Sequence, residues 1–188
     1  ICVFLGELYP RRHNGDLPNL EDVLECLTNF DLVEDLCEDL KKEPDLVEKY
    51  KFQLAYFEQH FYKDSTGRKD MERYVHFATA ELENLLRAGS VRDIICNRTN
   101  NLDFNKVLQD GEVVLLCTRP ADIGGTAHAG FGRFFLTLLM CAVEGRPGSD
   151  KTRIPYFLYV DEFDKYASPF FSDMVTLYRK YRVGTILA

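Results

Sequence analysis

The stretch Phe157-Leu158-Tyr159-Val160-Asp161-Glu162-Phe163, written FLYVDEF, decides the predicted fold. An apolar run rich in β-branched and aromatic residues is typical of a strand buried in a sheet. The run ends in two adjacent carboxylates, Asp161 and Glu162. Because ligands of open parallel sheets bind beyond the carboxyl ends of the strands, the two acids are candidates for a ligand site. The alternative is that they mark only the point where a buried strand reaches water.

Two more apolar runs, Val113–Thr118 and Val183–Ala188, predict further strands. The first has the continuous apolar character of a strand covered on both faces of a parallel sheet. An apolar helix, Ala127–Glu144, and a second helix that ends near Tyr181 separate the three predicted strands. Strand, helix, strand, helix, strand predicts parallel α/β winding in this half of the chain.

The segment 17–88 has a different hydrophobic pattern, because its apolar residues recur at helical spacing. It predicts four short helices that form a bundle with acidic outer faces, the first of them beginning at Asn19 as N-cap. The aromatic residues of the bundle are interpreted as core, with a recognition surface as the alternative. The last helix is expected to bury one stripe: Met71, Tyr74, Ala78, Leu82 and Leu85.

Composition narrows the class of protein. The 188 residues carry a net charge of −7, so the chain has no global attraction for nucleic acid, although a local basic patch stays possible. Six cysteines without a C-x-x-C pair favour reduced, buried thiols over disulfides or a metal site. No run reaches the roughly 18–20 apolar residues of a membrane span, so a cytoplasmic location is expected. Because the chain begins with Ile1, we expect a piece of a longer protein.

A strand that ends in two acids looks like the acidic half of a nucleotide-hydrolysing site. Asp161 is suited to hold hydrated Mg²⁺, and Glu162 to polarise an attacking water. The other half, the phosphate-binding motif G-x-x-x-x-G-K-[ST], is absent from the chain. The glycine-rich stretch Gly124–Gly132 has no Lys, and its glycines are interpreted as sites of close helix packing. The chain by itself is therefore expected not to hydrolyse ATP.

The densest basic segment is Tyr178-Arg179-Lys180-Tyr181-Arg182. Arg179 and Arg182 are candidates to contact a phosphate, the nucleotide of a neighbouring subunit, or nucleic acid. The alternative is a solvated helix end that complements the helix dipole. The four histidines are scattered and form no metal-binding pattern.

Three stretches together resemble a known family: LDFNKVLQDGEVVLLCTRP, FGRFFLTLLMCAVEGR and IPYFLYVDEFDKYASPFFSDMVTLYRKYRVGTILA. They look like the second half of the motor domain of conjugative coupling ATPases, the TraG/TraD-like proteins of type IV secretion systems in the FtsK–HerA superfamily. The resemblance covers Leu102–Ala188 and is weaker over Leu85–Asn101. Its most specific element is the DEF acidic motif, followed by a helix ending in R-K-Y-x-V-G and an I-L-A strand.

The resemblance implies an α/β fold, a partial parallel-sheet P-loop NTPase (RecA-like) core with an inserted all-α helical bundle. Residues 1–16 would be the tail of an upstream motor segment, 17–88 the inserted all-α domain, and 89–188 the acidic-motif half of the motor. In that family the phosphate-binding loop lies upstream, and a Gln that senses the γ-phosphate usually follows the position of Ala188. The nucleotide site of this chain would thus be incomplete.

The resemblance also implies a function. Family members use ATP and Mg²⁺ to pump single-stranded DNA with its relaxase, generally as membrane-anchored homo-hexamers. Asp161 would bind magnesium through water and Glu162 would be the catalytic base, while Arg179 or Arg182 would contact a phosphate or reach across a subunit interface. The full-length protein would be an ATPase at the cytoplasmic face of the inner membrane, attached through parts not in this chain. Two alternatives stay open: a non-catalytic helical module that binds proteins and keeps a vestigial nucleotide site, and a DNA packaging or segregation ATPase.

Overall fold

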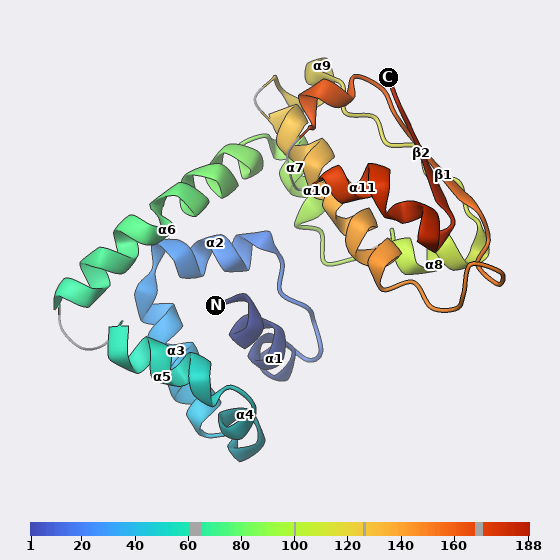
Figure 1. Ribbon diagram of the computed structural model, residues 1–188. Coiled ribbons are helices and arrows are strands. Elements are labelled where there is room, and N and C mark those ends of the chain that lie inside the picture. The colour runs from blue at the N-terminus through green and yellow to red at the C-terminus, as the bar shows by residue number, and fades with distance from the viewer. Residues whose placement is uncertain (61–64, 100, 126, 168–170) are drawn as a thin grey trace. The chain divides into compact units, whose positions relative to one another are not determined.

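A computed structural model describes residues 1–60, 65–99, 101–125, 127–167 and 171–188 (Figure 1). The chain divides into two compact units, Ile1–Arg98 and Thr99–Ala188. In its described part the first unit consists of helices: α1 (Cys2–Arg12), α2 (Leu20–Thr28), α3 (Phe30–Lys41), α4 (Pro44–Lys49), α5 (Lys51–His60), α6 (Ser65–Leu86) and α7 (Gly89–Ile95).

The start of α2 shows why these helices form where they do. The Asn19 side chain accepts hydrogen bonds from the backbone N–H groups of Glu21 and Asp22, at 2.8 and 3.2 Å. The Asp22 carboxylate accepts one in return from the Asn19 N–H at 2.7 Å, which completes a capping box. The Asn19 amide also donates to the Cys96 carbonyl, so the cap ties α2 to the end of α7. The predicted helix start at Asn19 is confirmed.

The core of the first unit lies between α1, α3, α4 and α5, where Val33 and Leu40 are fully buried. Helix α6 packs against this core through Met71 and Val75. The predicted stripe on α6 was wrong at Tyr74, which is 80% exposed, and at Ala78. The face that meets the core holds residues 71 and 75, so Tyr74 is turned away around the helix.

The second unit combines helices with a small sheet. Its elements are α8 (Phe104–Asp110), α9 (Pro120–Ile123), α10 (Ala127–Glu144), β1 (Tyr156–Val160), η1 (Phe163–Lys165), α11 (Ser172–Thr176), η3 (Tyr178–Tyr181) and β2 (Val183–Leu187). Strands β1 and β2 are parallel neighbours, with Tyr156 beside Val183 and Val160 beside Leu187. The strands predicted at the carboxyl end of the chain are therefore present and parallel.

The predicted fold class is nevertheless wrong. The chain is mostly helical, and in the described residues the sheet has only two strands, so there is no RecA-like parallel sheet core. The predicted strand Val113–Thr118 is extended but pairs with no strand, and Val113 and Leu115 are 86% and 93% exposed. An apolar run becomes a strand only when a neighbour supplies the ladder hydrogen bonds, and here none does.

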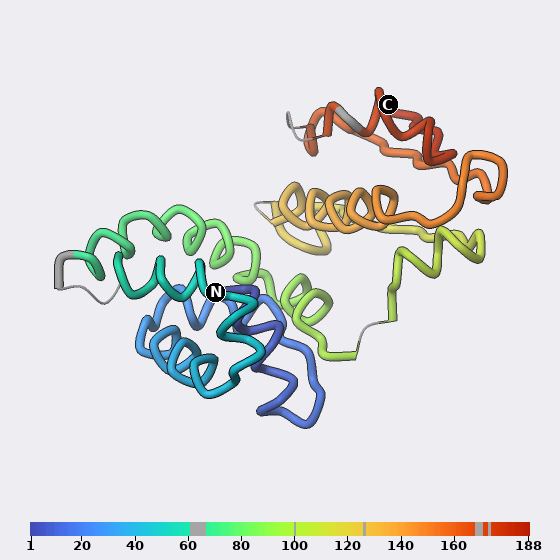
Figure 2. Tube along the Cα trace, turned by 60° about the horizontal axis from the view of Figure 1, so that its bottom comes forward, coloured from blue at the N-terminus to red at the C-terminus, as the bar shows by residue number. Residues whose placement is uncertain are grey.

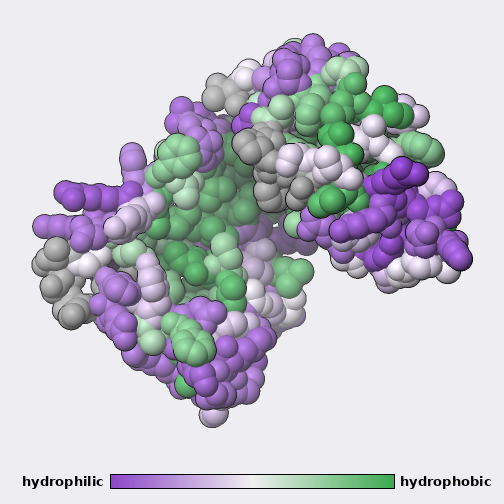
Figure 3. Space-filling model, in the orientation of Figure 1, coloured by the Kyte–Doolittle hydropathy of each residue, from purple (hydrophilic) through white to green (hydrophobic). Residues whose placement is uncertain are grey.

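The two faces of the sheet differ. Tyr156, Leu158 and Val160 point towards the core that α10 supplies, whereas Phe157 and Tyr159 are 60% and 70% exposed on the other face. Figure 2 shows α10 running alongside the extended segment that follows α8, and Figure 3 shows hydrophobic side chains at the surface over the sheet. Although α10 is the most apolar helix, no helix within the described ranges is long and apolar enough to cross a membrane.

Candidate active site

Asp161 and Glu162 follow directly after Val160, at the carboxyl end of β1. The parallel ladder continues to this point, since the Ala188 N–H donates to the Val160 carbonyl at 3.0 Å. The Phe163 N–H then donates to the Ala188 carbonyl at 2.9 Å. The ends of both strands thus hold the backbone on either side of the two acids.

The turn that carries the acids has an unusual backbone. Glu162 has φ 52° and ψ 44°, the left-handed region that residues with a side chain seldom adopt. This conformation costs roughly 1 kcal/mol, and such strain clusters at functional sites. The Glu162 N–H donates to Asp161 Oδ1 at 3.0 Å, which fixes the Asp161 carboxylate beside the turn.

Glu162 has a partner that the sequence reasoning missed. The Lys165 ammonium donates to its carboxylate from the 3₁₀ turn η1, three residues on. The same hydrogen bond raises the pKa of Lys165 above its ordinary value. The signal was present in the sequence as D-E-F-D-K, because an acid and a lysine three residues apart meet on one helical turn.

Tyr166 anchors η1 to the rest of the unit. Its buried ring lies against Gly132 of α10, where an added Cβ would overlap the ring. Its hydroxyl bonds Thr118 at 2.6 Å, and the Arg133 guanidinium donates to its carbonyl at 3.3 Å. The prediction that the glycine-rich stretch serves close helix packing is confirmed at Gly132 but was wrong at Gly124 and Gly125, where an added Cβ would meet nothing within 4 Å. Thr126 of that stretch lies outside the described residues.

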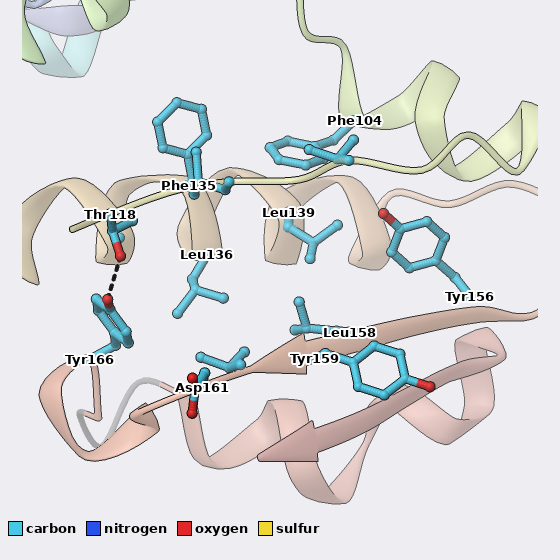
Figure 4. A pocket seen from close by; sticks show the side chains of 14 residues that line it. Phe104, Thr118, Phe135, Leu136, Leu139, Tyr156, Leu158, Tyr159, Asp161 and Tyr166 are labelled. Carbon is cyan, nitrogen blue, oxygen red and sulfur yellow. Dashed lines mark hydrogen bonds between the residues drawn. The ribbon is translucent and has the colours of Figure 1, made fainter. Parts of the chain in front are cut away.

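A cavity of about 270 Å³ opens beside the acids. Figure 4 shows its walls, with Leu136 and Leu139 of α10 facing Leu158 of β1 and the Thr118–Tyr166 bond at one end. Asp161 lies at the tip of β1 and is the charged residue among those that line the cavity.

The carboxylates at this site are compatible with a hard cation such as Mg²⁺. Within the described residues no group of three or more His, Cys, Asp or Glu side chains could hold a metal, so no all-protein cage forms. Mg²⁺ is commonly bound by one or two carboxylates, waters and the phosphates of a nucleotide. The Asp161 carboxylate at the strand end fits that mode, in which the nucleotide supplies part of the ligand set.

Comparison with protein-family models, curated proteins and solved structures finds no match to this chain. The roles expected of Asp161 and Glu162 therefore stay predictions.

The other two candidate residues lie elsewhere. Arg182 immediately precedes β2, and Arg179 lies in η3, so both are at the amino ends of the strands. A five-residue strand is about 16 Å long, which separates these residues from Asp161 and Glu162 within the unit. The structure therefore does not bring the two pairs of predicted site residues together.

Proposed function

We propose that this chain is part of an ATP-driven DNA-translocating coupling protein for conjugative transfer and type IV secretion. The observation that supports the proposal is the pair Asp161–Glu162 at the carboxyl end of a parallel strand, on a strained turn beside an apolar cavity. The supporting chemistry is that of a single strand end, which is present although the described residues form no RecA-like sheet core.

The proposed reaction is hydrolysis of ATP. Asp161 would hold hydrated Mg²⁺, which neutralises charge on the phosphates. Glu162 would accept a proton from the water that attacks the γ-phosphorus, as the bond from that phosphorus to the bridging oxygen breaks and ADP leaves. Because Lys165 donates to the Glu162 carboxylate, that ion pair has to open before Glu162 accepts the proton. The phosphates would be held by residues outside Ile1–Ala188, since the chain has no phosphate-binding motif.

The proposal assigns recognition of the secreted substrate to the helical unit. Phe52, Tyr74 and Phe77 expose most of their surface on α5 and α6, and the unit carries the whole excess of acidic residues. Exposed aromatic side chains are common in binding surfaces. The proposed partners are single-stranded DNA and its relaxase, with assembly into a homo-hexamer at the cytoplasmic face of the membrane.

The exposed aromatic residues of α5 and α6 also favour a second candidate, a non-catalytic helical module that binds proteins. The coding sequence upstream of Ile1 separates the two candidates. A strand followed by G-x-x-x-x-G-K-[ST] supports the motor. A start codon directly before Ile1 supports the module and contradicts the motor.

The chemical test uses the protein that this coding sequence specifies, with ATP turnover measured over a series of Mg²⁺ concentrations. Asp161→Asn should abolish most Mg²⁺-dependent turnover, because the strand end loses its metal-binding charge. Asp164→Asn is the matched control, since it removes an exposed acid of η1 that does not line the cavity. Normal turnover in Asp161→Asn, or equal loss in both variants, would exclude the proposed magnesium role.

A further inference from the structure

Four basic side chains gather at the amino ends of β1 and β2. They are Arg146, Arg153, Lys180 and Arg182, and we call them the cationic cluster. Arg153 lies in the loop before β1, and Lys180 and Arg182 lie at the end of η3. In Figure 3 this end of the second unit, where η3 and the loop after α10 lie, has a hydrophilic surface.

Hydrogen bonds to backbone carbonyls hold the cluster together. Arg146 is only 5% exposed and donates to the carbonyls of Leu108 and Ile154 at 2.6 and 2.7 Å. It also donates to the Tyr181 carbonyl at 3.0 Å. Arg153 donates in turn to the carbonyls of Arg146 and Lys180, at 2.9 and 3.0 Å.

The outer members of the cluster are held as well. Arg182 donates to the Arg153 carbonyl at 3.2 Å, from a backbone in the left-handed region with φ 58°. Two cations lie near the Tyr181 ring, with the Arg153 guanidinium 5.2 Å and the Lys180 ammonium 4.9 Å from its centre. Contacts of this kind orient a cation without neutralising it.

The charge of the cluster is not balanced locally. In the part of the chain that the structure describes, none of its four members forms an ion pair with an acid. The pKa of Arg146 is lowered by burial and, further, by the charges of Arg153 and Arg182. Carbonyl groups satisfy the donors of the guanidinium groups but carry no net negative charge, so the repulsion among the cations persists.

The inner and outer members of the cluster have different roles. Arg146 and Arg153 donate their hydrogen bonds to backbone carbonyls of the unit, so they are positioning residues. Lys180 and Arg182 are exposed to solvent, and the ring and carbonyl contacts hold them in place. Two exposed cations, held in place and backed by the buried Arg146 and the half-buried Arg153, suit a ligand with repeated single charges, because each phosphate needs only one nearby cation.

We propose that the cationic cluster binds the phosphodiester backbone of single-stranded nucleic acid, with Lys180 and Arg182 as the contacting residues. The choice of nucleic acid as the ligand rests on the proposed function, whereas the positive charge of the site follows from the structure alone. Two cations already lie close to the Tyr181 ring, so we expect the site to hold the backbone of the strand rather than its bases and to show no base preference. Because the cluster and the two acids lie at opposite ends of β1, binding and hydrolysis should be separable.

The test is fluorescence anisotropy of labelled oligo(dT) and oligo(dA) with the 188-residue chain, without ATP, at a series of salt concentrations. Replacing both contacting residues, K180Q/R182Q, should weaken binding about tenfold. It should also reduce the slope of log binding constant against log salt concentration by about 1.4 in magnitude, since each phosphate contact to a single strand contributes about 0.7. The matched control K51Q/K106Q removes two surface lysines that are paired with acids and should bind like the wild-type chain. Thermal unfolding of both variants verifies that they are folded.

Four results would overturn the proposal: no binding by the wild-type chain, unchanged affinity in K180Q/R182Q, equal loss in the control, or a strong base preference. Displacement of oligo(dT) by polyglutamate of equal charge at equal concentration would also overturn it, because it would identify a site for acidic protein segments. None of these results alters the expected effect of Asp161→Asn on ATP turnover, so a failure of this site is distinguishable from a failure of the proposed function.

Discussion

The two units of the chain handle charge in opposite ways. The first holds 20 of the 30 acidic and 13 of the 23 basic residues, so it carries the entire net charge of −7. The second holds ten of each and has no net charge, but two of its acids and four of its basic residues lie at opposite ends of the strands. Asp161 and Glu162 lie at the carboxyl ends, and the cationic cluster lies at the amino ends. A net charge of zero therefore does not exclude local charged sites, and in the second unit an acidic site and a basic site lie at opposite strand ends.

The largest expected effect contrasts a buried arginine with an exposed one. Arg146→Met leaves one buried carbonyl and two part-buried carbonyls without this donor and should lower the free energy of unfolding of the second unit by about 2–4 kcal/mol. Arg98→Met in the first unit removes a part-exposed pair with Asp22 and should cost less than about 1 kcal/mol. Urea unfolding followed by circular dichroism measures both. Equal losses would show that Arg146 does not hold the second unit together.

A smaller effect is expected at the open face of the sheet. Phe157→Thr and Tyr159→Thr replace exposed side chains with a strand-forming polar residue, so each should change stability by less than about 0.5 kcal/mol. They should reduce self-association, because an exposed apolar sheet face promotes it. Light scattering over a concentration series measures this. Phe52→Thr on α5 is the control in the first unit, and an equal reduction there would contradict a special role of the sheet face.

The smallest effect is chemical and leaves the fold intact. Cys2, Cys117 and Cys141 are exposed, whereas Cys26, Cys37 and Cys96 are buried, which corrects the expectation that the thiols are generally buried. Burial raises the pKa of Cys26 to about 11. Only the thiolate reacts, so Cys26 should stay protonated and unmodified up to pH 10, whereas the exposed cysteines are accessible to the reagent. Mass spectrometry after timed alkylation at each pH identifies the modified residues; early labelling of Cys26 would contradict its burial.

The sequence predicted features that depend on local spacing. The capping box at Asn19 and the acidic end of β1 were both recognisable, because each depends on residues a few positions apart. Val113–Thr118 was misjudged, because composition favours a strand but cannot say whether a partner lies beside it. Tyr74 was misjudged because α6 has more apolar residues than its buried face can hold.

The contacts that position the candidate site could not be predicted in the same way. Tyr166 contacts Thr118 and Gly132, which lie far from it in the sequence, and no local sequence pattern predicts such contacts. The sequence likewise does not predict the burial of Arg146, which belongs to a Gly-Arg-Pro-Gly loop. Its burial follows only from the three carbonyls that converge on it.

The most direct test of the proposed chemistry is single-turnover ATP hydrolysis by Glu162→Gln in the protein that carries the upstream coding sequence, with ATP affinity measured in parallel. Glu162→Gln keeps the shape of the side chain and removes its ability to accept a proton. ATP binding should therefore be retained while the hydrolysis rate falls by about 10²–10⁴-fold. A rate close to that of the wild-type protein would show that Glu162 is not the base and would contradict the function proposed for this strand end.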